Sequence, residues 1–476
     1  MFGQEPELLY EWSSVNYTWS STEQRIEAIN SGTYVVEKNV ITGVKQWGDN
    51  VYVTVPRWFG GVPATLAKVS SLKDSSGSFL LEPFPSWEMN DVNNINGLRY
   101  VQSMEIDPSG RMWIIDIGRL DIFTSNPING PAKLLVYDLN SDSLEREYIF
   151  PNSVAPFDSN FLNDIVVDFT RRVAYISDSG GPTVEGALVV YDYTTNSARR
   201  WEHPPTMAAV PSEFISINGV DYRDMLTPCD GIALTPDGNT LYYNPLTSLQ
   251  LYSIPTALFR DFSTTSEQLI SAITYHGAKE SQTDGMTFDS NGVLYFGLLS
   301  LNGVNSWLPA DGPLETSQSS LISPNTDTLQ WPDTFGFDNT GNLLFTTNRL
   351  QLFFNGSMNF TGEDANFRLF RVNIGEAGSY MSNMPPFDPP TTTTLTSSTS
   401  SETDGLGLFI VLTLFGNWRF LSCLFNKLEY YLLHLFVFIC YGTCNCYISH
   451  LLTKNIFPNI SLRLHFVLSL SLQVLF

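Results

Sequence analysis

The stretch TPCDGIALTPDGNTLYY, residues 227–243, decides the fold. It predicts an apolar strand at residues 232–234, a turn at 236–239 and a second strand at 240–243. Gly238 accepts the positive φ that a tight turn needs, so the stretch predicts a β-hairpin.

The same phrase recurs along the chain. Copies begin at Glu105 (EIDPSGRMWIIDIG), Val166, Met286 and Phe335, with a weaker copy from Val44. Most copies carry a turn glycine; the copy from Val166 has none at its turn. Six strand-rich copies at intervals of roughly 50 to 65 residues are typical of a β-propeller.

A further pair of strands is expected after each hairpin, as in LLVYDL followed by EREYIF at residues 134–150. Four strands in each of six units predict an all-β, six-bladed propeller over residues 1–385. A β-sandwich is the alternative, but it does not explain six similar phrases. Residues 386–405 are expected to form a disordered Ser/Thr/Pro linker.

The apolar tail, residues 406–476, has two interpretations. Its apolar runs are shorter than the roughly 20 residues that a membrane span needs. It is expected to be either a membrane attachment or a translated non-coding segment, so a membrane partner is expected only if the tail is real. A lipid-anchor signal fits less well, because such a tail would end earlier.

The formal net charge of −23 disfavours nucleic acids and acidic membrane surfaces as partners. It favours a cationic ligand, although solubility alone also explains it. Of the five cysteines, only Cys229 precedes residue 400, so the propeller is expected to lack an internal disulfide and a zinc site.

Three glycosylation sequons favour secretion, with acceptors Asn16, Asn355 and Asn359. The opening residues MFGQE carry neither the basic start nor the apolar run of a signal peptide. We therefore expect an extracellular protein whose N-terminal sequence is incomplete, with an intracellular protein as the alternative.

Several segments resemble the Yellow / major royal jelly protein family. They include ELLYEW, WGDNVYVTVPRWFGGVPATL and WPDTFGFDNTGNLLFTTNRLQLFFNG, and the similarity is collinear from about Glu5 to Ile374. The resemblance implies a secreted six-bladed propeller. Some members are linked to dopachrome conversion, some bind biogenic amines and some are nutritive storage proteins. The region around Ser109 lacks the cysteines of many insect members.

A ring of polar side chains is the candidate site. Five residues before each turn entry, where the first strand of a blade begins, five copies carry an amide or a carboxylate: Gln102, Asn163, Asp230, Asp284 and Asp333. The first copy has Ile41 or Thr42 there. First strands line the channel of a propeller, so this ring is expected at one mouth, beside the loops that join second and third strands.

The ring is expected to bind a small cationic or aromatic ligand, such as a protonated amine or a catechol-derived molecule. Asp230 and Asp284 are the candidate general bases for tautomerase-type chemistry. The alternative is that each side chain bonds its own backbone, as Asx residues often do. No cofactor is expected, although Ca²⁺ is possible, and His203 and His276 are too few for a transition-metal site.

Other residues are expected to have structural roles. Trp58, Trp113, Trp201 and Trp331 are expected to pack between blades. Arg57 and Arg349 are expected to be buried ion-pair partners or contacts to an anionic group of a ligand.

CDGIALTPDGNTLYY and TDGMTFDSNGVLYFG are also similar to phrases of Ca²⁺-dependent gluconolactonase-like propellers. That resemblance implies Asn163, Asp230 and Asp284 as metal ligands, although the first-blade Glu of those proteins has no match. Three hypotheses follow: a ligand-binding Yellow-like propeller, a Ca²⁺-dependent lactonase or hydrolase, and a storage or structural protein without a site.

Overall fold

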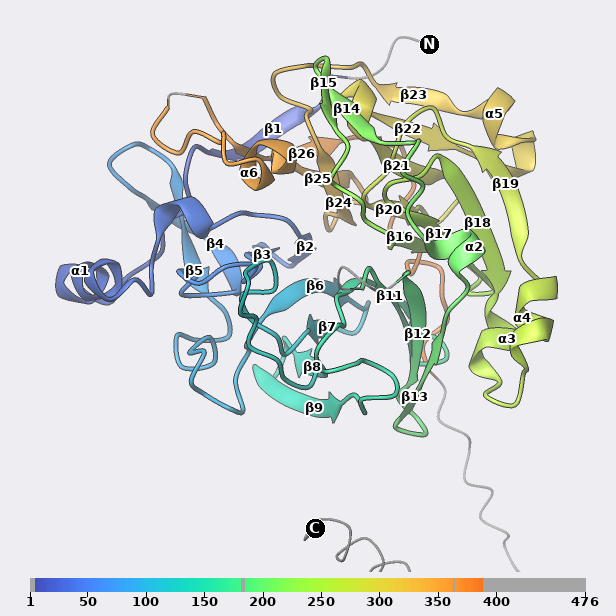
Figure 1. Cartoon of the computed structure of the whole chain (residues 1–476), viewed down its shortest axis with the longest axis horizontal. Coiled ribbons are helices and arrows are strands. Elements are labelled where there is room, and N and C mark those ends of the chain that lie inside the picture. Colours follow the sequence, from blue (N-terminus) through green and yellow to red (C-terminus); the bar gives the residue numbers. More distant parts are fainter. Residues whose placement is uncertain (1–4, 181–184, 363, 388–476) are drawn as a thin grey trace, which may run out of the picture. The chain divides into compact units, whose positions relative to one another are not determined.

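The computed structural model describes residues 5–180, 185–362 and 364–387. Within these residues, six four-stranded antiparallel sheets are arranged as a ring of blades around a central axis (Figure 1), with one further two-stranded hairpin. The predicted six-bladed propeller is therefore confirmed. The predicted linker and apolar tail lie outside the described residues, apart from Pro386 and Phe387.

The strands follow the repeat in chain order. Blade 1 contains β2 (Val44–Trp47), β3 (Asn50–Thr54), β4 (Leu66–Lys73) and β5 (Phe79–Pro83). Blade 2 contains β6 (Val101–Ile106), β7 (Arg111–Asp116), β8 (Lys133–Asp138) and β9 (Ser143–Ile149). Blade 3 contains β10 (Leu162–Asp168), β11 (Val173–Asp178), β12 (Ala187–Asp192) and β13 (Ser197–Trp201).

The second half is built in the same way. Blade 4 contains β16 (Cys229–Leu234), β17 (Thr240–Pro245), β18 (Gln250–Pro255) and β19 (Thr274–Ala278). Blade 5 contains β20 (Met286–Phe288), β21 (Leu294–Leu298), β22 (Gly303–Trp307) and β23 (Ser319–Ile322). Blade 6 contains β24 (Pro332–Phe337), β25 (Leu343–Thr347), β26 (Phe367–Val372) and the N-terminal strand β1 (Glu7–Trp12).

Short helices decorate the blades. They are α1 (Thr22–Ser31), α2 (Pro204–Met207), α3 (Thr256–Arg260), α4 (Ser266–Ser271), α5 (Leu314–Ser317) and α6 (Leu350–Phe354), with 3-10 turns η1 (Val36–Lys38), η2 (Leu299–Leu301) and η3 (Pro309–Asp311). The extra hairpin consists of β14 (Ile215–Ile217) and β15 (Val220–Tyr222). None of the helices in the described residues is long and apolar enough to cross a membrane.

The inner hairpins follow the turn chemistry of the sequence. Gly238 has φ +68°, the left-handed conformation that its turn requires. In blade 3, which lacks a turn glycine, Arg172 adopts φ +53° instead. The residue that enters a turn also bonds to the turn: Asp338 Oδ1 accepts from the backbone N–H groups of Thr340 and Asn342 at 2.8 and 2.9 Å.

Two glycines let neighbouring blades meet closely at the channel. A Cβ on Gly231 would lie 2.0 Å from the backbone oxygen of Asp284, and a Cβ on Gly285 would lie 2.0 Å from that of Asp333. A side chain at either position would overlap the next inner strand. The Asp-Gly pairs of the sequence therefore serve blade packing as well as the channel surface.

The ring is closed by strands from the two ends of the described chain. β1 pairs antiparallel with β26, with Glu7 opposite Arg371 and Trp12 opposite Phe367. After β26, residues 376–387 form a C-terminal strap, which runs from blade 5 to blade 3 across the turn side of the channel. Ser290 N donates to Gly378 O at 2.9 Å, and Thr170 Oγ1 donates to Pro385 O at 2.8 Å.

The loops between second and third strands lie where the repeat predicts, with one difference. In blade 5 this loop is short, because η2 follows β21 directly and the strand β22 begins at Gly303. The first turn of this loop is tightened by Asn302, which adopts φ +50°.

Candidate functional site

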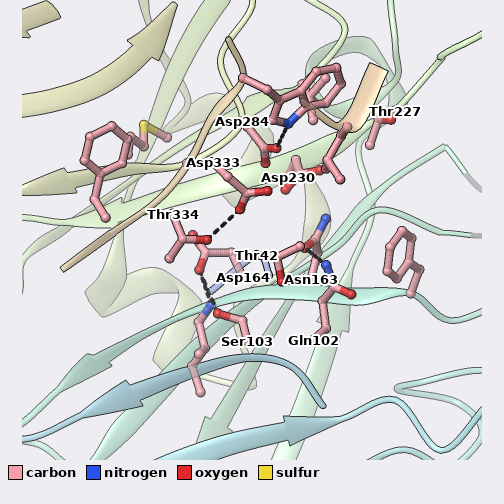
Figure 2. Close-up of a pocket in the computed structure, with 18 of the residues that line it drawn as sticks. Thr42, Gln102, Ser103, Asn163, Asp164, Thr227, Asp230, Asp284, Asp333 and Thr334 are labelled. Carbon is pink, nitrogen blue, oxygen red and sulfur yellow. Dashed lines mark hydrogen bonds between the residues drawn. The ribbon is translucent and has the colours of Figure 1, made fainter. Parts of the chain in front are cut away.

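The upper cavity lies in the channel at the end where the inner strands begin, and has a volume of about 90 Å³ (Figure 2). All five predicted ring residues line it, together with Thr42 of blade 1. The structure therefore brings the predicted ring together at one mouth. Loop and helix residues, among them Trp58, Phe123 and Phe354, complete the wall.

Irregular pairing aims the ring residues inward. In blades 2, 3, 4 and 6 the register between the first and second strands shifts, between Val101/Ser103, Leu162/Ile165, Cys229/Ile232 and Pro332/Phe335. Each interval contains the ring residue. A β-bulge redirects side chains in this way and is common beside functional sites. In blade 5 the ring residue Asp284 precedes β20.

Three carboxyls of the ring lie together. Figure 2 shows the side chains of Asp230, Asp284 and Asp333 pointing toward one another. Trp331 Nε1 donates to Asp284 Oδ2 at 2.6 Å. Asp333 accepts from Thr334 Oγ1 at 2.7 Å and from Asn348 Nδ2 at 2.6 Å. These contacts fix the carboxyls in position.

The amide side of the ring is bonded internally. Gln102 Nε2 donates to Asn163 Oδ1 at 3.0 Å, and Asn163 Nδ2 donates to Ser179 Oγ at 2.9 Å. Tyr100 OH donates to Gln102 Oε1 at 2.8 Å. Gln102 and Asn163 therefore form a polar wall whose hydrogen-bonding groups are already engaged.

A fourth carboxyl, Asp164, lies one residue deeper and was missed by the sequence reasoning. Its Oδ1 accepts from Ile165 N at 2.8 Å and from Ser103 Oγ at 3.4 Å, and its Oδ2 accepts from Ile232 N at 3.3 Å. The sequence carries a signal for it. At the matching position blades 4 and 5 have Gly231 and Gly285, so an Asp in this register stands out.

Burial raises the pKa values of these carboxyls, and at Asp230 and Asp284 the neighbouring aspartates raise them further. Burial is the largest cause at all four, and it raises the pKa of Asp164 and of Asp333 to about 6. The pKa of Asp230 is raised well above its usual value by burial, then by Asp164 and Asp333. The pKa of Asp284 is raised in the same way by burial, then by Asp333 and Asp230.

An ion pair forms the floor of the upper cavity. Lys45 Nζ donates to Glu105 Oε2 at 2.9 Å and to Phe335 O at 3.0 Å. Tyr380, on the C-terminal strap, accepts from Val167 N at 2.9 Å and donates to Glu105 Oε2 at 3.5 Å. Among the described lining residues Lys45 is the only basic one, and Glu105 occupies it. Lys45 lowers the pKa of Asp164 through its charge, but none of the four aspartates forms an ion pair with a described residue that lines the cavity.

An aromatic wall rises above the carboxyls. The ring centroids of Trp58 and Phe354 are 5.0 Å apart, those of Phe123 and Phe354 5.3 Å, and those of Phe123 and Phe161 6.0 Å. These side chains come from the loops after β3 and β7, from the start of blade 3 and from α6. Phe123 is 45% exposed, so part of the wall faces solvent.

The tryptophans divide into two pairs. Trp113 and Trp201 are buried within the blades, as expected; Trp113 Nε1 donates to Asp107 Oδ2 at 3.1 Å. Trp58 and Trp331 are also buried in the hydrophobic core, and in addition they line the upper cavity. Trp58 lies in the loop after β3, and Trp331 directly precedes the inner strand β24, so both lie at the mouth end of the channel.

The arginine expectation was wrong for Arg57. It is buried and donates to five backbone carbonyls, those of Val62, Pro63, Asn90, Leu98 and Arg99. These bonds occupy its guanidinium, it forms no ion pair with the described residues, and burial lowers its pKa to about 10. Arg349 likewise donates to a carbonyl, that of Asp327, at 2.8 Å.

Two of the three sequons are exposed. Asn355 and Asn359 are exposed, and each side-chain oxygen accepts from the hydroxyl of the Ser or Thr two residues later. Asn16 is half-buried, and its Oδ1 accepts from Tyr17 N at 2.9 Å and Trp19 Nε1 at 3.0 Å.

A Ca²⁺ ion would need several free oxygen ligands at one point. In the described part of the chain no group of three or more His, Cys, Asp or Glu side chains is placed to hold one. Of the implied calcium ligands, Asn163 already uses its Oδ1 with Gln102, and Asp284 uses one oxygen with Trp331.

Comparison with known proteins gives consistent matches. A family model described as "Major royal jelly protein" matches residues 100–380. Major royal jelly protein 7 of Apis mellifera is 30% identical over 400 residues, which cover 78% of this chain and 85% of that protein. Protein yellow of Drosophila melanogaster is 26% identical over 379 residues, which cover 77% of this chain and 68% of that protein. Among solved structures, a luciferin-regenerating enzyme matches with a TM-score of 0.43 and 16% identity, over 79% of this chain and 97% of that one.

Proposed function

Because the chain belongs to the Yellow / major royal jelly protein family, we propose that its upper cavity binds a small protonated aromatic amine or a catechol-derived amine. One observation carries the proposal: the buried carboxyls of Asp230 and Asp333, the half-buried carboxyl of Asp284 and an aromatic wall meet in a single cavity. Carboxylates in a poorly solvated site attract a cation strongly, and aromatic side chains bind both ring systems and cations.

Size indicates how such a ligand lies. The cavity volume of about 90 Å³ is smaller than the roughly 150 Å³ that accommodates benzene. The ammonium group therefore enters among Asp230, Asp284 and Asp333, and the ring stays at the mouth against Phe123 and Phe354. The two parts of the ligand meet separate parts of the protein.

Calorimetric titration of the purified, metal-free protein with dopamine and serotonin tests the proposal. Asp284→Asn keeps the acceptor for Trp331 but removes a charge, and it is expected to weaken binding about tenfold, or about 1.4 kcal/mol. Phe123→Ala is expected to weaken binding of the aromatic amines but not of methylammonium. Glu88→Gln, at an exposed carboxylate outside the cavity, is the matched control. Absence of saturable binding with any amine contradicts the proposal.

A second candidate is proton transfer of the dopachrome-conversion type. The raised pKa values of Asp230 and Asp284 favour it, because burial and neighbouring carboxyls make each carboxylate a stronger base than a free one. Conversion of dopachrome by the wild type, lost in Asp230→Asn and Asp284→Asn but kept in Glu88→Gln, is the expected result. Equal rates in all four proteins contradict it.

The same calorimetric titration, repeated with Ca²⁺, tests the lactonase-like and storage alternatives. Saturable Ca²⁺ binding that Asp230→Ala abolishes favours the lactonase-like alternative with Asn163, Asp230 and Asp284 as ligands. No heat with amines or Ca²⁺ favours a storage or structural protein.

Secretion is part of the proposal. The exposed acceptors Asn355 and Asn359 support it, because N-glycosylation takes place on the secretory route. When it is expressed in insect cells behind an added signal peptide, the protein should be glycosylated and reach the medium, and an Asn355→Gln/Asn359→Gln variant should lose most of the glycan mass. An unglycosylated protein retained inside the cells contradicts secretion.

A further inference from the structure

A second cavity lies on the opposite side of the propeller. This lower pocket has a volume of about 600 Å³ and is lined by the inner turns of blades 1, 2, 5 and 6 and by the C-terminal strap. It shares Lys45, Glu105 and Thr287 with the upper cavity. The Lys45–Glu105 ion pair therefore separates the two spaces, and each has its own chemistry.

The charged groups of the lower pocket are already paired. Asp107 accepts from the backbone N–H of Ser109 at 2.8 Å and, through its other oxygen, from Trp113 Nε1 at 3.1 Å. Asp338 accepts from its own turn through both oxygens, including Asn342 Nδ2 at 2.8 Å. Lys45 is held by Glu105. Of the charged lining residues, only Glu376, at the exposed edge, is left in the described structure without a partner.

Neutral hydrogen-bonding groups remain available. In the part of the chain that the structure describes, the Asn291 amide, the Ser382 hydroxyl and the Trp47 indole N–H form no hydrogen bond. Asn291 and Ser382 are exposed and Trp47 is half-buried, so a ligand can reach them. Oδ1 of Asn339 is also free, because this side chain bonds only through its Nδ2, to Gly48 O.

Trp47 is held as a flat surface at the pocket wall. A Cβ on Gly110 would lie 2.6 Å from the Trp47 ring, so the glycine lets the indole lie directly over the neighbouring turn. The ring also packs against the hydrophobic cluster of blades 1 and 2. The indole is therefore fixed without being fully covered.

We propose that the lower pocket binds a neutral sugar of one or two rings. A pyranose presents an apolar C–H face, which suits Trp47, and a rim of hydroxyls, which suits amides and hydroxyls such as those of Asn291, Asn339 and Ser382. The volume lies within the roughly 300 to 1,000 Å³ usual for small-molecule sites. A charged ligand would find no free counter-ion deep in the pocket.

Saturation-transfer NMR and calorimetry on the full-length protein test this proposal, with maltose, cellobiose and diacetylchitobiose as probes. At least one probe should bind saturably, Trp47→Ala should weaken that binding about tenfold or more, and Asn291→Ala should weaken it several-fold. Asn96→Ala removes an exposed amide outside the pocket and should change nothing.

The sugar proposal for the lower pocket and the amine proposal for the upper cavity can be refuted separately. Trp47→Ala and Asn291→Ala should leave dopamine binding in the upper cavity unchanged, which also shows that the variants are folded. No saturable binding of any probe sugar overturns the proposal. So does sugar binding that both variants leave intact.

Discussion

Replacing Asp333 by Asn is expected to stabilise the protein at neutral pH while it weakens amine binding. Asp333 accepts from Thr334 Oγ1 at 2.7 Å and from Asn348 Nδ2 at 2.6 Å. An asparagine keeps both contacts, because its oxygen accepts from Asn348 and its amide donates to the Thr334 hydroxyl. The substitution therefore removes a buried charge without leaving a partner unbonded.

The magnitude follows from the pKa. Burial raises the pKa of Asp333 from 3.8 to about 6. The folded state holds this proton more tightly than the unfolded state, so the contribution to stability is full below pH 3.8 and is lost as the pH rises through 6. At about 1.4 kcal/mol per pH unit, the ionised carboxyl costs about 3 kcal/mol at pH 7.5. With about 2.1 cal/mol/K of unfolding entropy per residue, this corresponds to about 4 °C in Tm.

Scanning calorimetry of the wild type and Asp333→Asn at pH 3.5, 6 and 7.5 checks the reasoning. The Tm difference should grow from near zero to about 4 °C in favour of the variant. Glu88→Gln should show no such trend. If Asp333→Asn lowers Tm equally at every pH, the carboxylate is a required hydrogen-bond acceptor and the reasoning is refuted.

Three further predictions concern the channel. Dopamine affinity should rise about tenfold between pH 5 and pH 7, because the Asp333 carboxyl, with a pKa of about 6, changes from mostly protonated to mostly ionised. Calorimetry of the wild type should show this rise, and Asp333→Asn should flatten it. Gly285→Ala should destabilise the protein by about 3 kcal/mol or more, because its Cβ would lie 2.0 Å from a backbone oxygen. A Cβ on Gly292 would lie in open space, so Gly292→Ala should cost only about 1 kcal/mol, from its φ of +82°. The free energies of unfolding of the two variants, measured by urea titration, should therefore differ. Lys45→Met should cost about 3 to 5 kcal/mol by leaving Glu105 buried without its cation, and adding Glu105→Gln should restore part of that loss in the same titration.

The fold was predictable because its signals are local and repeated. Each inner hairpin carries its own turn chemistry, such as Gly238 with φ +68°, and repetition makes the propeller clear. The ring was predictable for a related reason, since residues in one register of a repeat must meet around the axis. Even so, the β-bulges that aim Asp230 and Asp333 inward are not visible in the sequence.

Apart from Asp164, which lies in the repeat register, the site features that were not predicted from the sequence lie outside that register. The aromatic wall is assembled from Phe123, in the loop after β7, and Phe354, in α6, and no common spacing relates them. The C-terminal strap brings Tyr380 to Val167 across 213 residues. Such contacts depend on the finished three-dimensional arrangement, so they have no local sequence signature.

Closure of blade 6 by β1 has a consequence for how the protein is made. Glu7 and Arg371, which pair across this junction, are 364 residues apart. At about 5 to 20 residues per second, a ribosome needs roughly 20 to 70 s to synthesise that interval. Blades 1 to 5 can each form from contiguous sequence as it emerges, while β1 waits with an unpaired edge. During that time the first strand of one nascent chain is free to enter the last blade of another, so concentration and chaperone supply should govern the yield of closed monomers.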